Sequence, residues 1–209
     1  MLETLKEIDT QWFLWINSHH TTALDWTMWT LSQHWSWAVV LALAIIPLVF
    51  YTGTEKNCRK IYLERQCWMV IVGVGLCFFL ADQGSVHLFK EQFHRLRPCH
   101  AIESVRMFKT SCGGQYGFVS SHAANAWTVT TFLICCMAKK MKNKWPIILL
   151  LIWAILTCYS RSYLGKHYPG DLICGALFGT MIGLIIYMLC HCFKNNYNKR
   201  NKIEKNTFI

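Results

Sequence analysis

Residues 159–172 read YSRSYLGKHYPGDL, a polar stretch that lies between two segments made almost entirely of apolar residues. The stretch brings Arg161, Lys166, His167 and Asp171 close together. On the surface of a soluble protein such a group indicates little, because exposed charged residues are common. Beside long apolar segments it indicates a ligand or a reaction, because ionisable groups near the membrane core are costly to retain.

Apolar blocks on both sides of this stretch predict the fold class. The chain has 209 residues, 54% of them hydrophobic, and its apolar residues are grouped in blocks too long for a small soluble core. A spanning helix needs roughly 20 mostly apolar residues. The sequence therefore predicts an all-α, polytopic membrane helix bundle of five to six transmembrane helices. The five clearest blocks are residues 35–51, 67–88, 122–138, 145–159 and 172–193.

The N-terminal region predicts a different kind of helix. In residues 5–17, five apolar side chains share one helical face beside acidic and basic neighbours, a pattern typical of a helix in the membrane interface. The alternative is a helix that packs on the bundle as in a soluble protein. Residues 23–33 are expected to lengthen the first span at its outer end. The apolar face consists of Leu5, Ile8, Trp12, Trp15 and Ile16.

The chain is thus divided into three parts. We expect residues 1–34 to form an N-terminal interfacial helical segment, residues 35–193 a transmembrane domain that carries the functional residues, and residues 194–209 a basic tail.

Basic residues predict the orientation. The formal net charge is +10, and residues 53–66, residues 139–144 and the tail carry four, four and five of the 21 Lys and Arg residues. All three segments fall on one side if the five spans alternate, and the positive-inside rule makes that side cytoplasmic. We therefore expect a multi-pass protein of the plasma membrane, the inner membrane in a bacterium, with a cytoplasmic C-terminus and the functional loops on the outer face. Because topology accounts for the charge, no nucleic-acid partner is expected.

The first outer segment is KEQFHRLRP, residues 90–98. Seven residues separate Lys90 from Arg97, which is two turns of a helix, so both side chains are predicted on one face at the end of the second span. Pro98 is expected to end that helix.

Two further segments meet at the same face. In FVSSHAAN, residues 118–125, either Ser120 or Ser121 is a plausible N-cap for the third span, with His122 in its first turn. The free N–H groups of such a helix start form an anion site. The third segment is the opening stretch, in which Asp171 begins the last span.

Together these groups predict a phosphate site with a nucleophile. Arg binds phosphate oxygens in pairs and Lys supplies a point charge. A neutral His can attack phosphorus while a second, protonated His donates to the leaving oxygen, and a carboxylate can orient the first ring. The spans offer neither a carboxylate cluster for Mg²⁺ nor paired Cys/His spacing for Zn²⁺, so no metal and no cofactor are expected.

The three segments together resemble the signature of the type 2 phosphatidic acid phosphatase (PAP2) superfamily, K-x6-RP, then PSGH, then SR-x5-H-x3-D. The first and third match at every fixed position, whereas Val119 and Ser121 replace the Pro and Gly of the second. The resemblance implies His167 as a nucleophile that forms a phosphohistidine, His122 as general acid and Asp171 as partner of His167. It also implies four ligands of the phosphoryl oxygens, namely Lys90, Arg97, Ser120 and Arg161.

A metal-independent membrane phosphatase of lipid phosphates is the function that these residues predict. The resemblance allows undecaprenyl diphosphate, lipid A, phosphatidylglycerophosphate or phosphatidic acid as the substrate. Two alternatives stay open: a phosphotransferase that uses the same phosphohistidine, and a lipid-phosphate binder or transporter without enzymatic activity. The bilayer and the lipid substrate are the expected partners, and the oligomeric state is left open.

Two smaller patterns concern packing and covalent links. Cys99 and Cys112 lie in the predicted outer loop, where a disulfide persists, and the sequence leaves their pairing open. Gly175, Gly179 and Gly183 recur at four-residue spacing in the last span, which favours close helix packing within the bundle over dimerisation.

Overall fold

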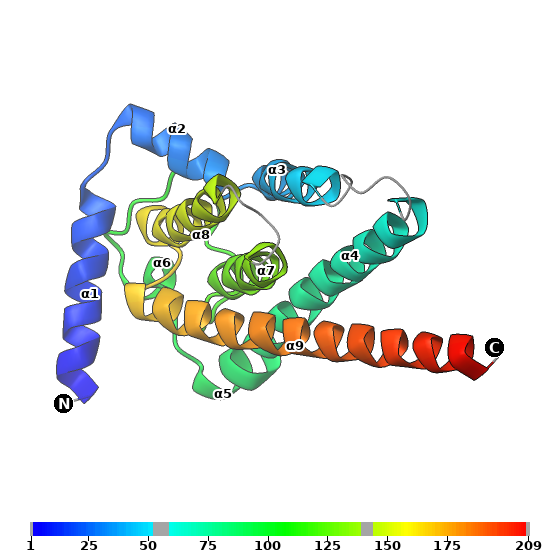
Figure 1. The fold of residues 1–209 in the computed structure, drawn as a ribbon. Helices are drawn as coiled ribbons and strands as arrows, with labels where there is room; N and C mark the ends of the chain where they lie inside the picture. The colour runs from blue at the N-terminus through cyan, green and yellow to red at the C-terminus, as the bar shows by residue number, and fades with distance from the viewer. Residues whose placement is uncertain (1, 52–58, 139–143, 208–209) are drawn as a thin grey trace.

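The computed structural model describes residues 2–51, 59–138 and 144–207, and over these ranges the chain is helical apart from loops and an isolated β-bridge (Figure 1). The predicted all-α class is therefore confirmed. The elements are α1 (Leu2–Ser18), α2 (Thr22–Leu31), α3 (His34–Tyr51), α4 (Arg59–Gly84), the π-helix η1 (Ser85–Lys90), α5 (Glu91–Phe93), α6 (Pro98–Ala101), α7 (Ser121–Met137), α8 (Trp145–Tyr163) and α9 (Pro169–Thr207).

Three of the described helices are long and apolar enough to cross a membrane: Trp68–Phe93, Trp145–Tyr163 and Pro169–Lys199. They correspond to three of the predicted spans, and they support an integral membrane protein. Residues 139–143 of the predicted basic connection 139–144, and the first part of that at 53–66, lie outside the described residues. The number of spans stays a prediction.

Helix α7 is the centre of the bundle and contacts α4, α8 and α9. Its larger side chains form the core with α4 and α9, where Val129, Phe132 and Leu133 are buried. Its small residues Ala123 and Ala124, also buried, face α9 and allow that helix to approach. The alternation of large and small residues thus decides which neighbour lies close to α7.

Three glycines of α9 lie against the start and the backbone of α7. A Cβ atom added to Gly175 would lie 2.8 Å from the carbonyl oxygen of Ser120, and one added to Gly179 would lie 2.2 Å from that of Ala124. At Gly183 the distance to the carbonyl oxygen of Thr128 would be 2.5 Å. The glycines therefore serve packing within the bundle, as the sequence favoured.

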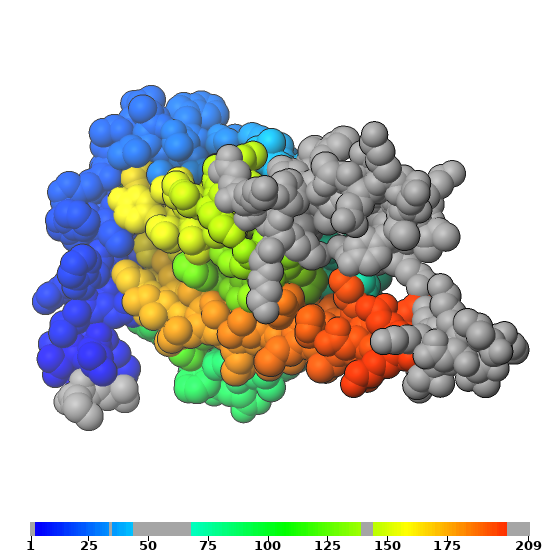
Figure 2. All heavy atoms as spheres, in the orientation of Figure 1, coloured from blue at the N-terminus to red at the C-terminus, as the bar shows by residue number. Residues whose placement is uncertain are grey.

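Helix α1 lies across the N-terminal end of α9 and forms one end of the molecule (Figures 1 and 2). Phe13 and Asn17 are buried against the bundle, and the Asn17 amide donates to the carbonyl oxygen of Tyr163 at 2.8 Å. Most of the predicted apolar face points away, with Trp12 60% and Trp15 57% exposed, whereas Ile16 packs against the bundle. One face of this helix thus docks on the bundle, as the second alternative describes. The opposite, tryptophan-bearing face is exposed, and its place in the membrane interface stays a prediction.

Residues 23–33 were expected to lengthen the first span at its outer end, and this expectation was wrong. They form the separate helix α2, which Thr21 caps and which ends in a turn at Ser32. The reason is Asp25, a buried carboxylate that accepts hydrogen bonds from Arg106 at 2.6 and 2.7 Å and from the hydroxyl of Tyr163 at 2.7 Å. This ion pair fastens α2 to the outer loop and to α8.

The contact between α7 and α9 predicts a difference between two glycines. Gly179→Ala forces a methyl group against the backbone of α7 and should lower the free energy of unfolding by about 1–3 kcal/mol. Gly75→Ala on α4 meets nothing within 4 Å and should be neutral or slightly stabilising. Thermal unfolding of both variants in the same detergent checks this, and equal melting temperatures would contradict it.

Candidate active site

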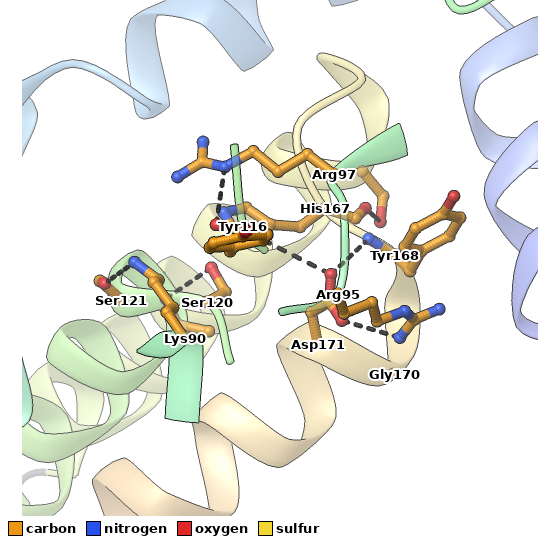
Figure 3. Close-up of polar contacts among 12 residues, drawn as sticks. Lys90, Arg95, Arg97, Tyr116, Ser120, Ser121, His167, Tyr168, Gly170 and Asp171 are labelled. Carbon is orange, nitrogen blue, oxygen red and sulfur yellow. Dashed lines mark hydrogen bonds and ion pairs between the residues drawn. The ribbon is translucent and has the colours of Figure 1, made fainter. Parts of the chain in front are cut away.

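The structure brings the three predicted segments together at one end of the bundle. Figure 3 shows the ring of His167 between two groups, with Lys90 and Ser121 on one side and Asp171 and Arg95 on the other. The segments come from the end of η1, the start of α7 and the junction of α8 with α9. Residues up to 81 positions apart in the chain, Lys90 and Asp171 among them, thus share one site.

The first segment differs from its prediction. Lys90 ends the π-helix η1, α5 adds one short turn, and the helical path stops at His94, whose φ of 48° is left-handed. Arg97 is extended, and Pro98 begins the short helix α6. The prediction of Lys90 and Arg97 on one helical face, with Pro98 ending that helix, was therefore wrong. The two side chains are brought together by a turn in the loop.

Arg97 is oriented by a small ribbon of backbone. Leu96 and Tyr116 form an antiparallel bridge, and the Arg97 side chain donates from Nε to the carbonyl oxygen of Tyr116 at 3.2 Å and from Nη1 to that of Cys112 at 2.9 Å. Cys112 is disulfide-bonded to Cys99, which settles the pairing that the sequence left open. The outer loop thus holds the guanidinium with neutral acceptors and leaves its charge uncompensated.

The second segment begins α7 as predicted. Ser120 is the N-cap, and its side chain accepts from the backbone N–H of Ala123. The Ser120 N–H donates to the carbonyl oxygen of Asp171 at 3.1 Å, so the starts of α7 and α9 are joined. His122 lies in the first turn, half-buried, with its ring centroid 6.0 Å from that of Trp37.

Arg161 lies in the last turn of α8 and is only 4% exposed. Its Nη1 donates to the hydroxyl of Ser32, while its Nε is buried without a hydrogen-bond partner among the described residues. A buried, charged donor without an acceptor is costly, so this atom is available to a ligand.

His167 and Asp171 form the centre of the third segment. His167 is 2% exposed, and its Nδ1 lies 3.6 Å from Oδ2 of Asp171, which is longer than a hydrogen bond. The Asp171 carboxylate is bonded elsewhere: Oδ1 accepts from Arg95 at 2.8 Å and Oδ2 from the backbone N–H of Tyr168 at 3.1 Å. The predicted partners are thus adjacent, and a small movement would join them.

Electrostatics keep His167 neutral. Burial, followed by the positive charges of Arg97 and Arg161, lowers the pKa of His167 well below its ordinary value. Since only the neutral ring has a lone pair, these conditions favour a nucleophile over a proton donor.

Comparison with known proteins identifies the family. The sequence profile of the PAP2 superfamily matches residues 65–194. The chain belongs to the PAP2 superfamily. It is 33% identical over 196 residues to the lipid A 4'-phosphatase of Bacteroides thetaiotaomicron, covering 91% of this chain and 80% of that protein. It is 25% identical over 171 residues to the undecaprenyl-diphosphatase of Bacillus subtilis, and the match covers 81% of this chain and 77% of that protein.

A solved structure agrees on the fold. The crystal structure of Aquifex aeolicus LpxE matches with a TM-score of 0.55 at 20% identity, over 85% of this chain and 93% of that one. The family and the phosphatase class that the three motifs predicted are confirmed by the profile match and by the relative with 33% identity.

Ser121 is one of the two positions, with Val119, at which this chain departs from the PAP2 signature, which has Gly at the position of Ser121. Its hydroxyl accepts from Nζ of Lys90 at 2.6 Å and lies 2.6 Å from the hydroxyl of Ser85. Glycine offers no such acceptor. The substitution therefore gives Lys90 a fixed, uncharged partner.

Sequence reasoning counted Arg95 and Lys166 among the cations of the outer loops but gave neither a role in the site. Both lie at variable positions within the PAP2 motifs, so motif spacing alone could not select them. Lys166 is half-buried, and burial, followed by the charges of Arg161 and Arg97, lowers its pKa to about 8. In the part of the chain that the structure describes, no three His, Cys, Asp or Glu side chains are grouped as metal ligands.

The disulfide gives the first prediction for this site. Alkylation without reduction should leave Cys99 and Cys112 unmodified, and mass spectrometry after reduction should show both labelled. The paired Cys99→Ser, Cys112→Ser variant should lose about 3 kcal/mol of stability, because the bridge closes a loop of sequence separation 13. Two thiols that react without reduction would contradict the bridge.

Lys166 gives a prediction about pH. Its ammonium is charged below about pH 8 and neutral above, so kcat/KM for a lipid phosphate should fall above about pH 8 as the free enzyme loses this cation. Lys166→Arg should move that decline to higher pH, since guanidinium keeps its charge. Lys109→Arg, at an exposed position of the outer loop, is the control. An unchanged alkaline limb in Lys166→Arg would show that Lys166 does not act.

Proposed function

We propose that this PAP2 protein is an integral membrane phosphatase that hydrolyses the phosphate of a membrane lipid, with lipid A as the best candidate. The observation that carries the proposal is a buried, neutral His167 among cations that lack carboxylate partners. Among the described residues, no ion pair is formed by Lys90, Arg97, Arg161 or Lys166. A dianionic phosphoryl group would supply the missing negative charge.

His167 performs the first step. Because Nδ1 faces Asp171, Nε2 attacks phosphorus, and a phosphorus–nitrogen bond forms as the bond to the lipid oxygen breaks. His122 donates a proton to that oxygen, so the lipid leaves as an alcohol or, from a diphosphate, as a monophosphate. Asp171 stabilises the positive charge that the ring of His167 acquires.

Water completes the cycle. His122, now neutral, removes a proton from a water molecule that attacks the phosphohistidine. The phosphorus–nitrogen bond breaks, inorganic phosphate leaves, and both histidines return to their starting states. Arg97, Arg161 and the N-terminus of α7 at Ser120 stabilise the charge on the phosphoryl oxygens in this scheme, which needs no metal ion.

The position of the site favours a lipid substrate. It lies where η1, α7 and α9 meet at the end of the bundle, so an acyl or prenyl tail can remain in the bilayer while its phosphate reaches the cations. The positive-inside rule places this end on the outer face and the C-terminus in the cytoplasm.

Lipid A is preferred among the possible substrates because the relative with 33% identity is named a lipid A 4'-phosphatase. Undecaprenyl diphosphate is the second candidate, from the relative with 25% identity. A phosphotransferase would use the same phosphohistidine with another acceptor than water. A binder or transporter would use the cations and have no need of His122 and His167.

Phosphate release from a panel of lipid phosphates, including lipid A and undecaprenyl diphosphate, tests the proposal with purified protein in detergent and EDTA. Release should persist in EDTA and fall by at least about 10³-fold in His167→Ala. His191→Ala, an exposed histidine on α9, is the matched control and should retain activity.

Other outcomes point to the alternatives. Phosphate transferred to a second lipid in place of release would indicate a phosphotransferase. Binding of lipid phosphates with no turnover would indicate a binder or transporter. Activity that EDTA abolishes would contradict the metal-free mechanism.

A further inference from the structure

Helix α1 reaches the candidate active site through one side chain. Asp9 lies on the face of α1 that docks on the bundle, four residues before the buried Phe13. Its Oδ1 accepts from the backbone N–H of Gly170 at 2.7 Å, and its Oδ2 accepts from Nη2 of Arg95 at 2.7 Å. One carboxylate of the N-terminal helix therefore holds both the start of α9 and a site arginine.

The contact with Gly170 is a helix cap supplied by another helix. Gly170 lies in the first turn of α9, where backbone N–H groups have no intrahelical acceptor. A Cβ atom on Gly170 would lie 2.8 Å from Oδ2 of Asp9, so only glycine allows this approach. The negative charge of Asp9 also suits the N-terminus of a helix.

Arg95 connects Asp9 to Asp171, because its guanidinium binds both carboxylates. Its Nη2 binds Asp9 and its Nη1 binds Oδ1 of Asp171 at 2.8 Å, while its guanidinium lies 4.2 Å from the ring centroid of Tyr168. The planar fork of arginine suits two carboxylates at once, and the aromatic ring fixes its plane. Although burial opposes it, the charges of Asp171 and Asp9 raise the pKa of Arg95, which stays protonated.

The Asp171 carboxylate is thereby fixed at both oxygens. Arg95 holds Oδ1, and the backbone N–H of Tyr168 holds Oδ2, as the third residue of a helix does in a capping box. Oδ2 is then directed toward Nδ1 of His167, 3.6 Å away. Without Arg95, only the backbone N–H of Tyr168 would hold the carboxylate, so its rotation away from His167 would cost less.

We propose that Asp9 and Arg95 are positioning residues for Asp171, so that the N-terminal helix α1 is part of the catalytic apparatus. The proposal rests on the proposed function, in which Asp171 supports His167. Nδ1 of His167 has no hydrogen-bond partner among the described residues. In this proposal the chain Asp9–Arg95–Asp171 directs the carboxylate so that a small approach places the proton of His167 on Nδ1, and Nε2 then carries the lone pair that attacks. The opposite face of α1 is exposed and bears the tryptophans. A single helix would therefore contact the lipid surface on one face and position the nucleophile through the other.

The kinetic test compares Asp9→Asn and Arg95→Lys with Glu7→Gln, an exposed carboxylate of α1 that serves as the matched control. Asparagine keeps an acceptor for Gly170 and loses the ion pair, and lysine keeps the charge and loses the fork. Both should lower kcat roughly 10- to 100-fold, the loss expected for one charged hydrogen bond, with KM and melting temperature little changed. Glu7→Gln should match the wild type.

A second readout does not require turnover. With ¹⁵N-labelled histidine, and His167→Ala to assign the signal, NMR should show the proton of His167 on Nδ1 in the wild type. Asp9→Asn and Arg95→Lys should move it partly to Nε2. An unchanged tautomer in both variants, or an unchanged kcat, would overturn the proposal. A wild type that keeps the expected tautomer but releases no phosphate would count against the proposed function alone.

Discussion

The close contact of α7 with α9 is the constraint on which the site depends. Glycines of α9 lie against the backbone of α7 at Ala124 and Thr128, and at the end of this contact the Ser120 N–H donates to the carbonyl oxygen of Asp171. Two helix N-termini are thus held at the same level. One offers free N–H groups to an anion, and the other carries the carboxylate that faces the predicted nucleophile. Any residue larger than glycine would separate the helices and, with them, the two halves of the site.

Around these helix starts the protein concentrates positive charge without neutralising it. Lys90 is held by the hydroxyl of Ser121, Arg97 by backbone carbonyls of the outer loop and Arg161 by Ser32. Uncharged acceptors orient these cations and leave their charge for a ligand, whereas carboxylates would have cancelled it. The same charges and the burial of His167 lower the pKa of that ring. In the proposed mechanism, phosphate binding and the neutral state of His167 therefore have the same physical cause.

Arg95 differs from these cations because its charge is paired with carboxylates. It is paired with Asp9 and Asp171, so it contributes little net charge to the phosphate site. Its fixed position instead joins α1 to the first turn of α9. A helix whose other face presents Trp12 and Trp15 outward is thereby anchored beside the chemistry, at the level where a lipid head group would lie.

Much of this protein could be predicted from its sequence. Long apolar blocks determine an all-helical membrane bundle, since the bilayer leaves few other solutions. The motif residues Lys90, Arg97, His122, His167 and Asp171, in order and at fixed spacing, determine the family and the phosphatase class. The prediction that Lys90 and Arg97 share one helical face was wrong, because a π-helix and the left-handed His94 interrupt the regular α-helix that the prediction assumed.

The tertiary structure alone decided the contacts between distant segments. The pairing of Cys99 with Cys112 needs the actual separation of two loop positions, and the buried Asp25 that turns α2 away from the first span needs Arg106 beside it. The role of Asp9 needs α1 to cross the start of α9. Spacing along the chain determines which residues a helix presents, because its geometry is local. Which residues from different helices meet depends on side-chain packing between elements, and no local pattern contains that information.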